Sequence, residues 1–198
     1  MRLLTTLAAF AALGVGAYAA APTVPRPAKE LEIDQPNGKH LLLSNYRGKV
    51  VIVQFLFTTC PHCQAYSQLL TKLQGEYGSR GFQALGGAFN EADNKMVTDY
   101  VNQYHVGFPV GVMQRETVTS FMGFSLLDRL VVPQIALIDR KGVIREESEA
   151  NPTVAPPLQN EQHLRASIEK LLAEGSATSR RTTPSKGSGS VKKPLSSK

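Results

Sequence analysis

The sequence predicts an α/β fold with a central mixed sheet flanked by helices on both faces. Strand-like apolar runs alternate with segments of helical periodicity, in the order βαβαβαββα. One run, residues 50–57 (VVIVQFLF), is nearly continuous and rich in β-branched and aromatic residues, which is typical of a strand buried on both faces. Such alternation predicts a layered domain in which helices cover a sheet and an antiparallel pair of strands lies near the end of the chain.

Turn and capping residues bound the expected elements, and Asp93 is the expected N-cap of the second helix. In order, the elements are a short apolar run at 41–43, strand 50–57, helix Pro61–Tyr77, strand Phe82–Phe89, helix Asn94–Tyr104, strand Phe108–Met113, helix Arg115 to about Met122, strand Ile135–Asp139, a turn at 140–142, strand Val143–Glu147 and helix Glu161–Ala173, stopped by Gly175.

The two ends of the chain differ in composition from its centre. Arg2 and the apolar run at 3–17 predict a signal peptide over residues 1–19, cleaved after Ala19 or, alternatively, after Ala21; the other interpretation is an uncleaved membrane anchor. We expect a flexible, proline-containing lead-in at 20–30, a folded domain at 31–174 and a basic disordered tail at 175–198. The predicted location is therefore extracytoplasmic, with membrane contact if the signal stays attached.

Net charge is concentrated in the tail. The chain carries 22 Lys and Arg against 16 Asp and Glu, and six of the basic residues with no acidic residue fall in 175–198. The remaining 16 basic and 16 acidic residues balance, so the sequence argues against a nucleic-acid-binding face on the domain. We interpret the tail as a solvated segment, with contact to an anionic surface or partner as the alternative.

The two cysteines, Cys60 and Cys63, follow the buried strand directly in the string FTTCPHCQ. Pro61 suits the first turn of a helix, so Cys60 is expected at the helix N-terminus and Cys63 one turn later on the same side. The free N–H groups and partial positive charge of a helix N-terminus favour a thiolate at Cys60, and His62 can donate to the same sulfur or stabilise its charge. The pair therefore has the arrangement of a redox-active dithiol.

The size of the pKa shift that a helix N-terminus produces in a thiol helps to decide between a redox-active pair and a static disulfide. A free thiol has a pKa of about 8.5, whereas Cys-X-X-Cys sites at helix N-termini reach values of about 7 down to about 3.5. A static disulfide over so short a loop would stabilise the fold by only about 2 kcal/mol. A metal site would need Cys60 and Cys63 to meet distant histidines (His40, His105 and His163), and their spacing does not indicate this. The redox interpretation is favoured over both alternatives.

With this motif in place, the region from about Leu31 to Ala173 resembles the TlpA/ResA-like branch of exported thiol-disulfide oxidoreductases, with redoxin and AhpC-TSA-like neighbours. The matching segments are NGKHLLLSNYRGKVVIVQF, TTCPHCQ, YHVGFPVGVM and VVPQIALIDRKGVI. The resemblance implies a thioredoxin-like fold and disulfide exchange through Cys60 and Cys63, with no cofactor beyond their redox-active disulfide and no metal. It also implies that Val132–Pro133 is a cis peptide that faces the Cys60 sulfur and helps to dock a partner.

The chain departs from the family pattern near the cysteines. Thr59 stands where relatives usually have Trp, Tyr66 where many have an acidic residue, and Gln54 where thioredoxins have a buried Asp. A buried carboxylate that moves a proton at Cys63 is therefore in doubt. Glu91 and Asp93 could replace it, although their interpretation as a loop residue and an N-cap is simpler.

The sequence thus predicts an exported thiol-disulfide oxidoreductase. Cys60 attacks, Cys63 resolves, Pro61 and His62 tune the Cys60 sulfur, and Val132 and Pro133 dock the partner. The expected partners are exported proteins with thiols or disulfides and an upstream thiol donor or acceptor. His62 and the missing carboxylates favour an oxidising site. The alternatives are a peroxiredoxin-like peroxidase, although no Thr stands three residues before Cys60, and a copper- or zinc-binding module.

Overall fold

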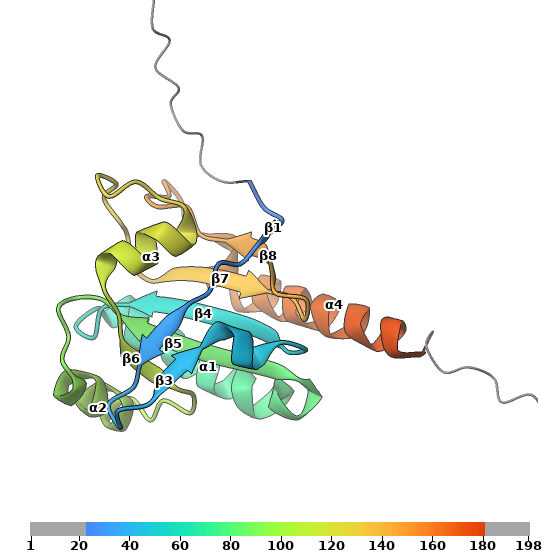
Figure 1. Cartoon of the computed structure of the whole chain (residues 1–198), viewed down its shortest axis with the longest axis horizontal. Helices are drawn as coiled ribbons and strands as arrows, with labels where there is room; N and C mark the ends of the chain where they lie inside the picture. Colours follow the sequence, from blue (N-terminus) through green and yellow to red (C-terminus); the bar gives the residue numbers. More distant parts are fainter. Residues whose placement is uncertain (1–22, 181–198) are drawn as a thin grey trace, which may run out of the picture.

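A single mixed sheet of eight strands forms the centre of the domain (Figure 1). The computed structural model describes residues 23–180. The strand order is β1-β8-β7-β4-β5-β6-β2-β3, in which β5 runs parallel to β4 and β6 whereas the other neighbours are antiparallel. This confirms the predicted α/β fold and the antiparallel pair, which is β7 with β8.

The strands and α-helices occur close to their expected positions. Their bounds are β1 Arg26–Pro27, β2 Glu32–Asp34, β3 His40–Leu42, β4 Val50–Leu56, α1 Pro61–Tyr77, β5 Phe82–Ala88, α2 Asn94–Gln103, β6 Val110–Val112, α3 Arg115–Met122, β7 Gln134–Ile138, β8 Val143–Glu147 and α4 Glu161–Arg180. The two short strands β1 and β2 were not expected.

Alternate side chains of β4 point to opposite faces of the sheet, and each face has its own buried cluster. Val50, Ile52 and Leu56 belong to a buried cluster shared with α1, α2 and α4. The intervening Val51 and Phe55 belong to a second cluster on the other face, which includes α3. All seven residues of β4 are buried, as the continuous apolar run predicted. Gln54 lies on the same face of β4 as Val50, Ile52 and Leu56. Its buried side-chain amide therefore lies beneath α1, the helix that begins after Cys60.

The described part of the predicted lead-in is attached to the sheet, so the expectation of a flexible segment over 20–30 is wrong for it. Arg26 and Pro27 pair with Ile144 and Val143 at the outer edge of β8. The Arg26 guanidinium also donates to Glu147 at 2.6 Å and to the Phe121 carbonyl at 3.0 Å. Proline is compatible with such an edge strand, because no further strand requires its missing N–H.

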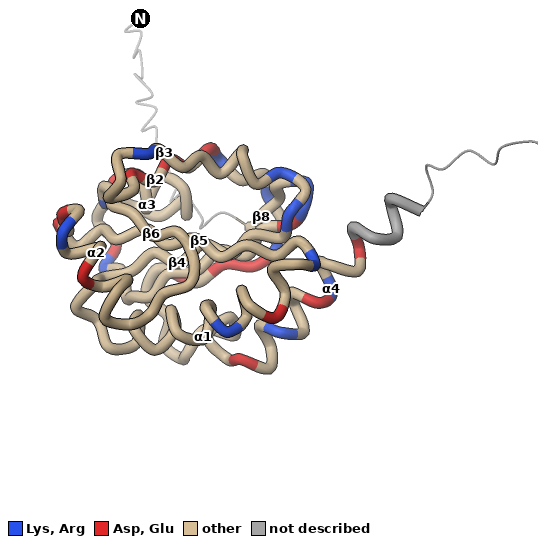
Figure 2. The backbone as a smooth tube through the Cα atoms, turned by 90° about the horizontal axis from the view of Figure 1, so that it is seen from below, with Lys and Arg blue, Asp and Glu red and all other residues tan. Residues whose placement is uncertain are grey.

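The last helix is longer than predicted. It continues through Gly175 to Arg180 instead of ending at Ala173, so the proposed tail boundary at 175 is also wrong (Figures 1 and 2). An interior glycine costs a helix about 1 kcal/mol relative to alanine. That cost is too small to end a helix whose preceding turns are anchored by buried Leu164, Ile168 and Leu171.

The predicted signal peptide at 1–19 and residues 181–198 of the predicted tail lie outside the described residues. Within residues 23–180, none of the helices combines the length and apolar character needed to cross a bilayer.

Candidate functional site

Cys60 occupies the junction between the central strand and the first helix. β4 ends at Leu56, and Cys60 is the N-cap of α1, with extended backbone angles and Pro61 as the first helical residue. The Cys63 N–H points to Cys60 Sγ at 3.4 Å. A donor aimed at the sulfur from the positive end of a helix stabilises negative charge there. The predicted position of the pair at the helix N-terminus is confirmed.

The two sulfurs differ in their access to solvent. Cys60 is half-buried whereas Cys63 is fully buried, and both are free thiols, so the structure describes the reduced form of the pair. Burial raises the pKa of the Cys63 thiol far above its usual value, and the neighbouring Cys60 adds to the effect. Cys60 is therefore the sulfur that an incoming protein can reach first. Cys63 stays protonated and buried behind it until the second step of an exchange reaction.

The loop before β7 lies against Cys60. Val132–Pro133 is a cis peptide, and the Val132 carbonyl accepts from Cys60 Sγ at 3.8 Å. This confirms the predicted conformation and placement, while the docking role stays a prediction. Buried Gln134 holds the loop, since its Nε2 donates to the carbonyls of Val131, Glu149 and Ala150. Gln134 was not singled out from the sequence, although it directly follows Pro133.

A buried network of uncharged groups lies beneath Cys63. Nε2 of Gln54 donates to the Cys63 carbonyl at 2.9 Å, and its Oε1 accepts from Ser67 Oγ at 2.8 Å. The hydroxyls of Ser67 and Tyr100 are 2.7 Å apart, and Tyr100 also donates to the Cys63 carbonyl at 3.1 Å. All of these side chains are at most 2% exposed. Gln54 therefore holds the backbone of Cys63, and no carboxylate takes part.

The other position where relatives carry an acid is likewise uncharged. The Tyr66 hydroxyl donates to the Leu158 carbonyl at 2.9 Å, and burial raises the pKa of Tyr66 above its ordinary value. Ser67 and Tyr100 were not singled out from the sequence. The available signal was the glutamine inside the apolar run of β4, because a buried amide requires partners.

A second set of polar contacts holds the loop that carries Cys60. Asn90, just after β5, donates through Nδ2 to Thr58 Oγ1 at 3.1 Å and accepts the Thr58 N–H at 3.2 Å. Gln64 Nε2 donates to the Thr58 carbonyl at 3.1 Å. The two strand ends and the first turn of α1 are thereby joined around the residue two positions before Cys60. No sequence pattern indicated Asn90.

The remaining singled-out residues lie at the margin of the site. His62 is exposed and forms no hydrogen bond or ion pair within residues 23–180, so its tuning role stays a prediction. Asp93 accepts the Met96 N–H at 2.7 Å, which confirms it as the N-cap of α2. Glu91 and Thr59 are exposed.

Candidate metal ligands gather elsewhere. Glu32 and Asp34 of β2 and His40 of β3 lie within 4.8 Å of one another, all exposed, on the outer hairpin of the sheet. In the described part of the chain, Cys60 and Cys63 join no third His, Cys, Asp or Glu at that spacing. The Cys/His metal module considered from the sequence thus has no assembled ligand set there.

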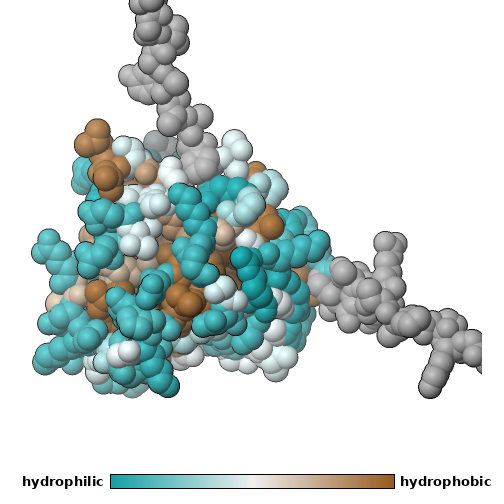
Figure 3. Space-filling view, viewed as in Figure 1, coloured by the Kyte–Doolittle hydropathy of each residue, from teal (hydrophilic) through white to brown (hydrophobic). Residues whose placement is uncertain are grey.

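An apolar loop precedes the cis-proline in the sequence. Leu126 is 59% and Leu127 is 95% exposed in the segment between α3 and Val132. Figure 3 shows apolar side chains at the tip of this loop, on the side of the sheet where β4 ends and α1 begins in Figure 1. The chain runs from this loop into Val132 and Pro133, which face Cys60.

Comparisons with known proteins point to one class. Residues 20–160 match the Redoxin family. A thiol-disulfide oxidoreductase ResA of Bacillus thuringiensis is 28% identical over 110 residues, covering 56% of this chain and 60% of that protein. Another from Geobacillus thermodenitrificans is 27% identical over 153 residues, covering 74% and 84%. This chain therefore matches less than two thirds of the length of the first relative.

Solved structures agree in fold. A thiol:disulfide interchange protein of the thioredoxin family from Chlorobium tepidum has a TM-score of 0.63 at 25% identity, covering 77% of this chain and 99% of that one. A thiol:disulfide interchange protein from Bacteroides has a TM-score of 0.61 at 18% identity, covering 76% and 91%. The predicted thioredoxin-like fold is confirmed by these neighbours.

Proposed function

This chain belongs to the Redoxin family, and from that premise we propose that it is a thiol-disulfide oxidoreductase using Cys60 and Cys63. The observation that carries the proposal is the difference between the two sulfurs. Cys60 is accessible, accepts a backbone N–H and faces the Val132 carbonyl, whereas Cys63 is buried one turn behind it. The names of the matched relatives support the same activity.

The reaction follows from this arrangement. The Cys60 thiolate attacks one sulfur of a partner's disulfide, so that a Cys60–partner bond forms and the second partner sulfur leaves as a thiolate. Cys63 then loses its proton and attacks Cys60 Sγ, which releases the partner's remaining thiol. The chain ends as the Cys60–Cys63 disulfide, and an upstream thiol donor must reduce it again. The reverse sequence installs a disulfide in a partner.

The neutral surroundings of Cys63 bear on the second step. Gln54 and Tyr66 cannot accept its proton at neutral pH, so that proton passes to solvent or to the leaving partner thiolate. We propose that resolution is slow relative to the first attack, and that the site has an oxidising potential. A glutathione-equilibrium potential close to that of thioredoxin, about −270 mV, would contradict the second statement.

We also propose that the partners are exported proteins and that this chain is exported with them. The apolar run at 3–17 supports export.

The exposed Leu126 and Leu127 support a partner that presents apolar residues near its cysteine. Replacing both leucines by Ser should raise KM for a protein disulfide and leave the rate with a small disulfide unchanged.

Insulin reduction with dithiothreitol tests the activity. Cys60→Ser should abolish turnover. Reduced Cys63→Ser, mixed with insulin in the absence of dithiothreitol, should accumulate a mixed disulfide at Cys60 that mass spectrometry detects. Glu116→Gln is the control, because this exposed side chain on α3 belongs to no part of the site and should leave turnover intact. Full turnover by Cys60→Ser, or trapping at Cys63 instead of Cys60, would reject the assignment of roles.

A further inference from the structure

Residues 82–103, which form β5, the following turn and α2, hold each of the two cysteines through one side chain. β5 pairs with β4 along all seven residues of both strands, and α2 packs into the same buried cluster as α1 (Figure 1). Asn90 follows β5 and contacts the loop before Cys60, while Tyr100 lies in α2 and contacts Cys63. This β5–α2 unit contains no cysteine, so both contacts lie outside the motif that predicted the site.

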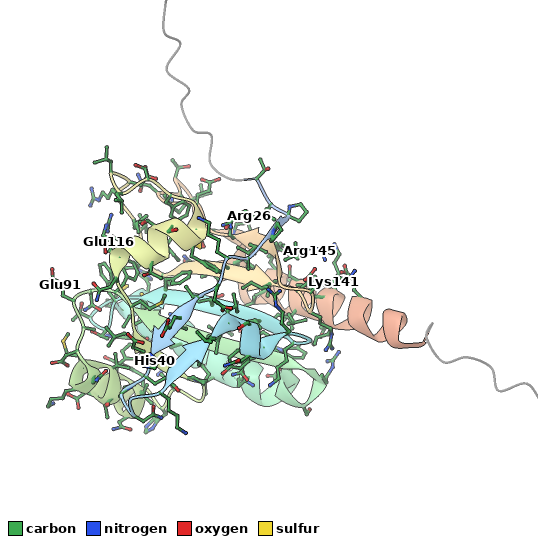
Figure 4. All side chains as sticks on the ribbon, in the orientation of Figure 1. Arg26, His40, Glu91, Glu116, Lys141 and Arg145 are labelled. Carbon is green, nitrogen blue, oxygen red and sulfur yellow. The ribbon has the colours of Figure 1, made fainter. Side chains whose placement is uncertain are left out.

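Asn90 holds the loop that carries Cys60. Its side-chain amide donates to Thr58 Oγ1 at 3.1 Å and accepts the Thr58 N–H at 3.2 Å, so two hydrogen bonds restrict one residue. The Cys60 N–H in turn donates to the Phe57 carbonyl at 3.1 Å. The next residue after Asn90 is Glu91, whose positive φ of 55° turns the chain sharply, and Figure 4 labels its exposed side chain. The end of β5 is thereby held next to the strand end that leads into Cys60.

Tyr100 holds the other cysteine. Its hydroxyl lies 3.1 Å from the Cys63 carbonyl and 2.7 Å from Ser67 Oγ, and the whole residue is buried. Gln54 donates to the same carbonyl from β4, so a strand and a helix together hold the backbone of Cys63. A buried polar group that loses its partner is costly, which keeps these contacts closed.

Holding both cysteines matters for the step in which one sulfur attacks the other. Closure of the Cys60–Cys63 bond depends on how often the two sulfurs meet in the right geometry, which is an effective concentration. A dithiol whose backbone is already held loses less conformational freedom when the disulfide forms. The two anchors therefore speed closure and stabilise the disulfide relative to the two thiols.

We propose that Asn90 and Tyr100 are positioning residues that raise the effective concentration of Cys63 at Cys60. This inference rests on the proposed function and adds to it the residues that set the rate of resolution and the redox balance. Neither side chain forms a hydrogen bond with a sulfur within residues 23–180, so both act through the backbone that carries the cysteines. The other interpretation is that the same contacts only stabilise the fold.

Equilibration of the full chain with glutathione separates the two interpretations. Oxidised glutathione takes two electrons and two protons from the dithiol and leaves as two thiols, so the equilibrium constant reports the stability of the disulfide. The test variants are Tyr100→Phe and Asn90→Ala, each of which removes one anchor. Tyr104→Phe and Asn102→Ala are the matched controls, because they make the same changes at the end of α2 in side chains that form no hydrogen bond within residues 23–180. Ile144→Val, in the buried cluster on the other face of the sheet, controls for a loss of stability alone.

Each anchor variant should lower the equilibrium constant for disulfide formation about fivefold, which is the scale of one net hydrogen bond. For a two-electron couple this loss moves the reduction potential by about 20 mV toward more oxidising values. In rapid-quench measurements, closure of the glutathione mixed disulfide at Cys60 should slow by a similar factor. In a Cys63→Ser background, Tyr100→Phe should leave the first attack of Cys60 on oxidised glutathione unchanged, because that step does not involve Cys63. If Asn90→Ala does not fold, Tyr100→Phe alone should show these losses.

Unchanged closure and equilibrium in Tyr100→Phe would overturn the proposal. Equal losses in the matched controls or in Ile144→Val would also overturn it, since they would assign the effect to stability. A slower first attack in Tyr100→Phe would contradict it by showing that the hydroxyl acts on Cys60. A wild-type chain that forms no Cys60–Cys63 disulfide with oxidised glutathione would reject the proposed function itself, and the two positioning roles with it.

Discussion

The two ends of the central sheet handle polar groups in opposite ways. At the end of β4, the groups beneath Cys63 are buried and uncharged, and they bond to one another and to backbone. The start of β4 lies at a basic end of the domain, formed by Arg47, Lys49, Arg80, Arg140 and Lys141. There Arg47 and Arg140 donate to turn carbonyls, and Lys49 and Arg80 lie over tyrosine rings. Burying a charge is costly, whereas burying a paired amide is not. The support beneath Cys63 can therefore be buried and uncharged, whereas the basic end keeps its charges near the surface.

The largest expected difference between the two ends is in stability. Gln54→Leu removes the donor to the Cys63 carbonyl and the acceptor for Ser67 in a fully buried site, so the free energy of unfolding should fall by up to about 3 kcal/mol. Lys141→Gln at the basic end should change it by less than about 0.5 kcal/mol. Urea unfolding of both variants measures the contrast. Similar values for the two would mean that the buried network contributes little.

The pH dependence of stability sharpens the contrast at Cys63. Burial raises the pKa of this thiol, so the folded reduced chain keeps a proton that the unfolded chain releases above about pH 8.5. The free energy of unfolding should therefore be insensitive to this group at lower pH. It should then fall by about 1.4 kcal/mol per pH unit, or about 2 kcal/mol by pH 10, where tyrosines begin to titrate.

Denaturant unfolding of the reduced protein at several pH values measures this slope. Cys63→Ala supplies the control, since it removes the group that titrates and should remove most of the slope. An alkaline decline of the same size in Cys63→Ala would assign the effect to other residues.

The smallest effect concerns the glycines of the basic end. Gly142→Ala combines a positive φ with a collision against Arg47 and should destabilise the domain by about 1–2 kcal/mol. Gly75 lies in α1 with open space around its Cα, so Gly75→Ala should stabilise by about 0.5–1 kcal/mol. Thermal unfolding of the two variants should show changes in Tm of opposite sign. A neutral Gly142→Ala would show that Arg47 moves aside without cost.

Local patterns were enough to predict most of the framework and the central motif. β4 and α1 have strong periodicity, and proline after Cys60 fixes where the helix begins. The cis peptide at Val132–Pro133 was available only from the family resemblance, since proline alone does not determine it.

The supporting contacts could not be read from local patterns. Gln54, Ser67 and Tyr100 come from three separate elements and meet only when α1 and α2 pack on the sheet. Asn90 reaches Thr58 across 32 residues. The same holds for β1, because two residues have no periodicity and form a strand only when β8 is already in place.

The pairing of Arg26 and Pro27 with β8 has a consequence for association between copies of the domain. A free outer strand offers unpaired N–H and C=O groups on which a second chain can assemble. β1 pairs with Val143 and Ile144 at the start of β8, and Pro27 has no N–H to donate to an incoming strand. Arg26, tied to Glu147, adds charge to the same rim. The start of this sheet edge is therefore not available for pairing with a second chain, so a short segment outside the predicted domain reduces the tendency of the edge to aggregate.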